Sequence, residues 1–109
     1  MTHVMVAGTS EPQDFQLLNE GVALVGTGFT LGIEFASNGT YTAAQVTALA
    51  GVIVTWLSQA TGTVRASTGI SALPIGLYPF RFTLTDSGSK KGYVPNLDAS
   101  PNLWRVVKV

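Results

Sequence analysis

The chain has 109 residues, enough for one domain with a single core and too few for two independent cores. It contains no cysteine, which excludes disulfide bonds, thiolate metal sites and a cysteine nucleophile. Charged residues make up only 11% of the chain and the net charge is zero, so part of the surface must consist of Thr, Ser, Gly and exposed apolar side chains. We expect such a surface to assemble with other proteins.

The first half of the chain predicts three strands and a turn. Two short strands are predicted at 4–7 and 22–25, and a longer one at 29–35, where apolar side chains occupy every second position. The dipeptide Asn38-Gly39 ends this strand in a tight turn. The side chains of the longer strand that should face the core are Phe29, Leu31, Ile33 and Phe35.

The middle of the chain is free of charge between Glu34 and Arg65, and much of the segment 43–57 is apolar. Its dense apolar part is about a dozen residues long, whereas a membrane-spanning helix needs about 20. Membrane insertion is therefore not expected, and the segment predicts a buried strand or an interface, with a strand at 52–57. Over 43–50, one or two helical turns capped by Thr42 are equally compatible with the sequence.

The second half predicts four more strands, at 64–67, 78–84, 91–94 and 104–109. In the strongest of them the aromatic and apolar residues again alternate, and it stops at Asp86-Ser87-Gly88-Ser89, which predicts a hairpin turn. Pro79 cannot donate to a strand ladder, so it should lie at an edge or near the start of its strand. The segment 96–102 is predicted as an irregular surface loop. The alternating residues are Tyr78, Phe80, Phe82 and Leu84.

Seven or eight short strands separated by turns predict an all-β fold, an Ig-like antiparallel β-sandwich formed by one domain over residues 1–109. The charges are divided along the sequence, since every charge before Arg65 is acidic and all six basic residues lie from there onward. This division is compatible with head-to-tail contacts between subunits. We favour the alternative that the two halves interleave in the fold and their charges mix on the surface.

The sequence offers no recognisable catalytic constellation, and we expect no enzyme activity, no cofactor and no metal. The one histidine, His3, lies on a predicted strand near the amino terminus, and no Gly-x-Ser-x-Gly elbow accompanies it. Gly26-Thr27-Gly28 lacks the third glycine and the helix of a dinucleotide site, and predicts a turn. Asp86 is the only carboxylate in its Ser- and Gly-rich segment, too few for a calcium loop.

Two other binding functions compete with protein–protein assembly. Nucleic-acid binding would need a basic stripe, and zero net charge gives phosphates little long-range attraction, so we do not expect it. A glycan site would need aromatic faces in solvent. The candidate residues of a glycan site are Trp56, Tyr93 and Trp104. The candidate residues of a basic stripe are Arg81, Lys90, Lys91, Arg105 and Lys108.

Two pieces of the sequence, together about half of the chain, resemble a family of Ig-like domains of phage virion proteins, typified by the amino-terminal domain of the siphophage baseplate upper protein. The first piece is 15–31, with a turn before Gly21, a short strand, Gly26 and an alternating strand. The second is 73–86, which is similar to the family's G-x-Y-x-x-x-F-x-[VL]-T-D strand, followed by Gly88, Val94-Pro95-Asn96 and the valine-rich end at 104–109.

The resemblance implies a β-sandwich and a structural role in a virion. It carries no catalytic residues. Because the sequence given ends at Val109, we expect an accessory or decoration subunit docked on a capsid, tail or baseplate, in contact with other virion proteins or with copies of itself. The amino terminus lacks the features of a secretory signal, so the protein is expected to be made in the host cytoplasm. The alternative is a small carbohydrate-binding module that recognises a cell-surface glycan; the binding residues are unknown in either case.

Overall fold

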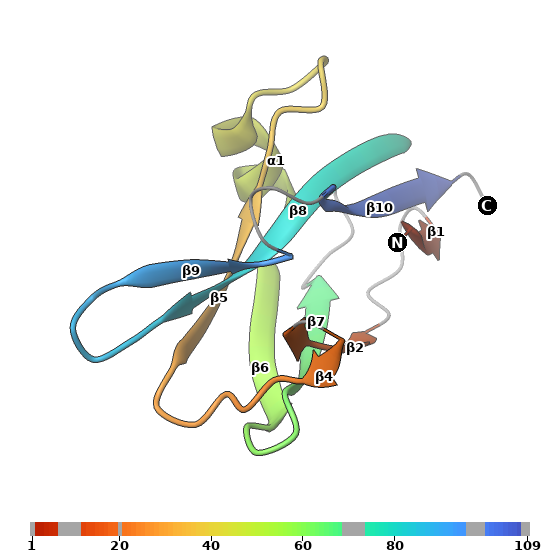
Figure 1. The fold of residues 1–109 in the computed structure, drawn as a ribbon. Coiled ribbons are helices and arrows are strands. Elements are labelled where there is room, and N and C mark those ends of the chain that lie inside the picture. Colours follow the sequence, from red (N-terminus) through yellow and green to blue (C-terminus); the bar gives the residue numbers. More distant parts are fainter. Residues whose placement is uncertain (1, 7–11, 20, 69–73, 96–99, 108–109) are drawn as a thin grey trace.

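Strands dominate the structure, as the alternation predicts (Figure 1). The computed structural model describes residues 2–6, 12–19, 21–68, 74–95 and 100–107. Its elements are β1 (Thr2–Val6), β2 (Gln13–Gln16), β3 (Leu18–Asn19), β4 (Val22–Ala23), β5 (Thr30–Phe35), α1 (Ala43–Ala50), β6 (Val52–Ser58), β7 (Thr63–Thr68), β8 (Gly76–Thr85), β9 (Lys91–Val94) and β10 (Asn102–Val107).

The two larger sheets pack face to face, and β3 and β4 form a separate two-stranded sheet. The large sheet has the order β1-β10-β8-β5, with β9 also paired to β8, and the small sheet has the order β2-β7-β6. By their order in the sheets, β2, β7 and β6 correspond to strands B, E and D of an immunoglobulin domain, and β5, β8 and the final strands to C, F and G. The expected Ig-like β-sandwich is confirmed, with one departure: β1 pairs with β10 in parallel.

β9 and β10 follow each other along the same edge of β8. At Phe80 the central strand pairs with β5 on one side and with β10 on the other, and at Phe82 it pairs with β5 and with β9. The last two strands therefore act as one interrupted partner of β8. The interruption includes the cis peptide bond between Val94 and Pro95 and much of the predicted surface loop, of which 96–99 lie outside the described residues.

Aromatic side chains from both sheets form the core. Phe15 of β2 contacts Phe80 and Phe82 of β8 edge-on, with ring centroids 5.8 and 5.0 Å apart. In antibody domains a disulfide joins strands B and F at the corresponding place; here the contact between Phe15 and Phe80 links the two sheets. Trp104 of β10 lies against Phe35 and Phe80 and is fully buried. The core is thus held by aromatic packing, as the cysteine-free sequence requires.

The segment 43–50, for which the sequence left two possibilities, is helical. Thr42 caps α1 by accepting a hydrogen bond from the Gln45 backbone, and the Gln45 side chain accepts one from the Thr42 backbone, which completes a capping box. Gly51 ends the helix in the left-handed conformation. Val46 and Ala50 are buried in the core. Of the buried strand or interface expected for 43–57, a strand is present from Val52 onward, and alternate side chains of that strand are exposed.

Two strands were missed and one residue was misplaced. β2 has a single buried apolar residue, Phe15, among Gln and Asp, and therefore shows no apolar alternation. β3 is only two residues long. Phe29, predicted to face the core, lies just before β5 and is exposed.

Pro79 is near the start of its strand, as predicted, although β8 is central in the sheet. The Pro79 carbonyl accepts a hydrogen bond from the Ala36 backbone, and within a strand the nitrogen and the carbonyl of one residue point to the same side. The ring nitrogen of Pro79 therefore also faces β5. Pro79 lies one residue past Phe80, which forms the last pair of the ladder between β8 and β5. The missing N–H of Pro79 therefore does not interrupt the sheet.

Candidate assembly surface

The outer surface of the large sheet is apolar over the half formed by β1, β10 and the start of β8. In these strands alternate residues point away from the core, and the pairing places Val4, Arg105 and Leu77 in one row across the three strands. Val4 and Leu77 are among the most exposed large apolar side chains of the described residues. We call this surface the apolar face; it comprises Val4, Leu77, Pro79, Leu103, Arg105 and Val107.

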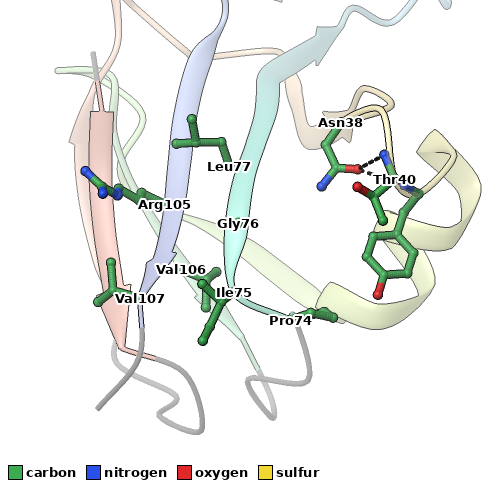
Figure 2. A pocket seen from close by; sticks show the side chains of 10 residues that line it. Asn38, Thr40, Pro74, Ile75, Gly76, Leu77, Arg105, Val106 and Val107 are labelled. Carbon is green, nitrogen blue, oxygen red and sulfur yellow. Dashed lines mark hydrogen bonds between the residues drawn. The ribbon is translucent and has the colours of Figure 1, made fainter.

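A shallow hollow of about 820 Å³ adjoins the apolar face (Figure 2). One wall is the segment Pro74–Leu77 with the end of β10, and the other is the turn at Asn38. The Asn38 side-chain oxygen accepts hydrogen bonds from the backbones of Thr40 and Tyr41, at 3.0 and 2.8 Å, so the predicted turn is confirmed. Exposed Ile75 extends the apolar surface into the hollow.

The other half of the same outer surface is polar and internally paired. Lys91 of β9 forms an ion pair with Glu34 of β5 at 3.1 Å, and the hydrogen bond from this carboxylate is the main reason that the pKa of Lys91 is raised. Arg81 donates to the Pro95 carbonyl at 2.8 Å. These polar groups are engaged in bonds within the subunit, so among the described residues the apolar face is the half of the sheet without such pairing.

The small sheet also carries an ion pair that joins the two halves of the sequence. Arg65 of β7 binds both carboxylate oxygens of Asp14 of β2, at 2.8 and 3.1 Å. The hydrogen bond from Arg65 lowers the pKa of Asp14. With the pair between Glu34 and Lys91, acidic residues of the first half meet basic residues of the second. The expectation that the charges mix is confirmed for these four residues.

The two segments examined for phosphate and calcium chemistry are turns. The Phe29 backbone donates to the Gly26 carbonyl at 3.1 Å, which closes a turn, and Gly26 lies so close to the Trp56 ring that a Cβ atom would clash with it. In the hairpin between β8 and β9, the Asp86 carboxylate accepts hydrogen bonds from the backbones of Gly88 and Lys90, both at 2.9 Å. Asp86 therefore has a structural role in the turn.

The structure separates two of the basic residues considered for nucleic acid. Arg105 stands beside Leu77 and Lys91 beside Thr85, at opposite ends of β8, roughly 25 Å apart at the rise of a strand. Lys108 and the side chain of His3 lie outside the described residues. Among the residues that the structure describes, no three His, Cys, Asp or Glu side chains gather into a group that would hold a metal ion.

Of the two tryptophans considered for a glycan site, one is buried and the other is partly buried. Trp104 is 0% exposed and Trp56 is partly buried against the core. The indole nitrogens of both are buried, without a hydrogen-bond partner among the described residues. Tyr93, which is half-buried on the polar part of the large sheet, is the remaining aromatic residue of that set.

The sequence did not identify the apolar face. A signal was present in 103–107, where Leu103 and Val107 accompany Trp104 and Val106, so that apolar residues occupy both faces of the strand. Alternation alone marks only the core-facing set. Consecutive apolar residues in a strand of a two-layer sandwich would have indicated a second, outward-facing apolar surface.

Comparisons with known proteins do not extend these assignments. No protein-family model, no curated protein and no solved structure matches the chain. Within the described part of the chain, α1 is far too short to cross a membrane, and no other helix is found there. The resemblance to phage virion domains therefore remains a sequence-based expectation.

Proposed function

We propose that this chain is a phage virion structural protein, an accessory or decoration subunit that docks on a capsid, tail or baseplate through its apolar face. The apolar face is the observation that carries the proposal. It joins exposed Val4 and Leu77 across three strands, with Arg105 as its one charge. Exposed contiguous apolar surface of this kind marks protein–protein contacts.

The composition and the fold agree with this function. Only 11% of the residues are charged, and the ion pairs at Asp14 and Glu34 use up part of that charge on other surfaces. The Ig-like sandwich provides a rigid support on which one face can be specialised for contact. The resemblance at 15–31 and 73–86 supports the proposal that this contact is made in a virion.

The alternative of a carbohydrate-binding module loses its main support, because Trp104 is buried and Trp56 contributes to the core. Sugar recognition by aromatic stacking needs a ring face in solvent. No other observation among the described residues favours it, so we propose assembly alone.

The test measures binding of the purified protein to particles of a phage that carries its gene. We expect the wild-type chain to co-sediment with gradient-purified particles and the variant Leu77→Asp to bind at least about tenfold more weakly, since the change puts a desolvated charge into an apolar contact. The matched control is Val22→Asp, which places the same charge on an exposed apolar residue of β4, outside the apolar face.

Both variants should keep the near-ultraviolet circular dichroism of the wild type, because both residues are exposed in the fold. Failure of the wild type to bind particles, or equal binding by Leu77→Asp and the wild type, would contradict the proposal. Weakened binding by Val22→Asp, with normal binding by Leu77→Asp, would place the contact on another surface.

A further inference from the structure

Within the part of the chain that the structure describes, β6 is an edge strand that pairs along one side only. The two strands next to β6 are β7, in the same sheet, and β5, which lies across the sandwich. β6 pairs with β7 and forms no ladder with β5. The ladder to β7 is regular from Val52 to Trp56 and shifts only beyond that point. Just past the strand, the Gly26 backbone donates to the Gln59 carbonyl, which marks the end of the open edge.

β6 lacks the features that usually prevent an edge strand from pairing with another chain. Charged residues, prolines and very short length are the common devices. The seven residues of β6, Val-Ile-Val-Thr-Trp-Leu-Ser, include no charge, no proline and no glycine. Such a segment is a template for strand addition, in which backbone hydrogen bonds extend the sheet.

Three other edges in the described structure do carry such devices. β2 is four residues long and contains Asp14. β5 contains Glu34 and Gly32. β9 is four residues long, contains Lys91 and is followed by Pro95. β1, the remaining edge of the large sheet, is five residues long, and among its side chains only that of Val4 is described. The unprotected composition is therefore a property of β6 and is not shared by the edges in general.

The outward-facing side chains of β6 are complementary to themselves. Ile53 and Leu57 are 61% and 47% exposed, and Thr55 lies between them. When two copies of β6 pair in antiparallel fashion about Thr55, all seven residues overlap, Ile53 of each copy faces Leu57 of the other, and the two Thr55 side chains meet. These are apolar and Thr–Thr pairs, which stabilise a sheet.

The electrostatics of this pairing favour a second copy over a charged partner. No charge occurs between Glu34 and Arg65, so two copies of the strand bring no like charges together. The neighbouring Arg65 is already neutralised by Asp14. A two-fold axis through Thr55 also closes the contact in a dimer, which is the commonest symmetry of soluble homo-oligomers.

We propose that two copies of this chain associate through β6, which joins their small sheets into one continuous six-stranded sheet of order β2-β7-β6-β6-β7-β2. This inference concerns the subunit's own state and adds to the proposed docking function without using the apolar face. In a virion subunit, the dimer would place two apolar faces on one building block.

Single cysteine variants test the register directly, because the chain has no cysteine of its own. Opposite residues of an antiparallel pair have Cα atoms about 4.5 or 5.5 Å apart, within the range that a disulfide spans. We expect Thr55→Cys to form a disulfide-linked dimer under mild oxidation at least about tenfold faster than Thr30→Cys, which is also exposed, on β5. A mixture of Ile53→Cys and Leu57→Cys should cross-link faster than either variant alone.

A charge variant tests the same contact without cross-linking. Thr55→Glu stands beside Arg65, so the subunit should keep its fold, but two carboxylates meet at the axis of the dimer. We expect its dissociation constant, measured by light scattering across a concentration series, to rise about fivefold or more relative to the wild type. Thr30→Glu is the matched control and should dimerise like the wild type.

A wild type that stays monomeric over the whole series, or Thr55→Cys that reacts no faster than Thr30→Cys, would overturn the β6 dimer. Either result would leave the docking proposal intact, because particle binding through Leu77 is measured separately. Normal dimerisation with failed particle binding would have the opposite meaning, namely that the subunit pairs through β6 but does not dock through the apolar face.

Discussion

Tyr78 is the residue that ties the start of β8 to the segment before it. Its hydroxyl donates a hydrogen bond to the Pro74 carbonyl at 2.6 Å, four residues upstream, and its ring is fully buried. This arrangement has the form of the tyrosine corner of immunoglobulin folds, in which a tyrosine near the start of strand F bonds back to the preceding backbone. Phe80 follows two residues later, at the place of the second cysteine of antibody domains.

Removal of this hydroxyl should weaken the fold measurably. We expect Tyr78→Phe to lower the free energy of unfolding by about 1 kcal/mol, because the ring packing is kept while one hydrogen bond is lost. Urea denaturation followed by circular dichroism measures the change. Tyr93→Phe, at a half-buried position on the outer surface, is the matched control and should change stability much less. Equal effects of the two substitutions would contradict a special role for the corner.

The same residue makes a pH-dependent prediction. Burial, with a smaller contribution from Tyr41, raises the pKa of Tyr78 above its ordinary value of 10.0. Above about pH 10, the unfolded chain therefore holds fewer protons on this group than the folded chain, and the free energy of unfolding falls as pH rises. We expect the stability advantage of the wild type over Tyr78→Phe to shrink across this range. An advantage that stays constant would show that the phenol ionises alike in both states.

At the scale of single elements, α1 depends on its capping box. Replacement of Thr42 by Ala removes the side chain that accepts from the Gln45 backbone, and we expect a loss of about 1 kcal/mol in the free energy of unfolding. Thr40→Ala, in the exposed turn before the helix, is the control and should cost much less. Thermal or urea denaturation measures both. An unchanged stability of Thr42→Ala would mean that the burial of Val46 and Ala50 alone holds the helix.

The strands that the sequence predicted are marked either by apolar alternation or by flanking turn residues. β5, β6, β8 and β9 lie where alternation or turn residues placed them, to within about two residues. β2 has only Phe15 on its buried side, and the partners that make it a strand lie far away in β7. Tertiary pairing of this kind has no local signal in the sequence, and the same is true of the parallel pairing of β1 with β10.

At the scale of the whole molecule, the single aromatic core predicts one cooperative unfolding transition. Phe15 of the small sheet and Trp104 of the large sheet both contact Phe80, so neither sheet can lose its packing alone. We expect tryptophan fluorescence and far-ultraviolet circular dichroism to report the same urea midpoint. Two separate midpoints would show that the chain contains two units and would contradict the single domain predicted for 1–109.

The candidate surface was less predictable than the fold. Low charge correctly indicated that apolar side chains would be exposed, but the sequence could not say which ones. Leu77 and Val4 become neighbours only through the pairing of both strands with β10. Exposure of Trp104 was likewise open in the sequence, since a terminal valine-rich strand fits an edge as well as a core position. In both cases the answer depends on the strand order.

The pairing of β1 with β10 has a consequence for biosynthesis. β1 precedes β10 by almost 100 residues in the sequence, so β1 has no ladder to join until the stretch between the two strands has been synthesised. Closing such a long loop is a slow, late event, because its entropic cost is met before any contact is gained. During translation the nascent chain therefore exposes an apolar strand of its own that a neighbouring nascent chain on the same messenger could capture.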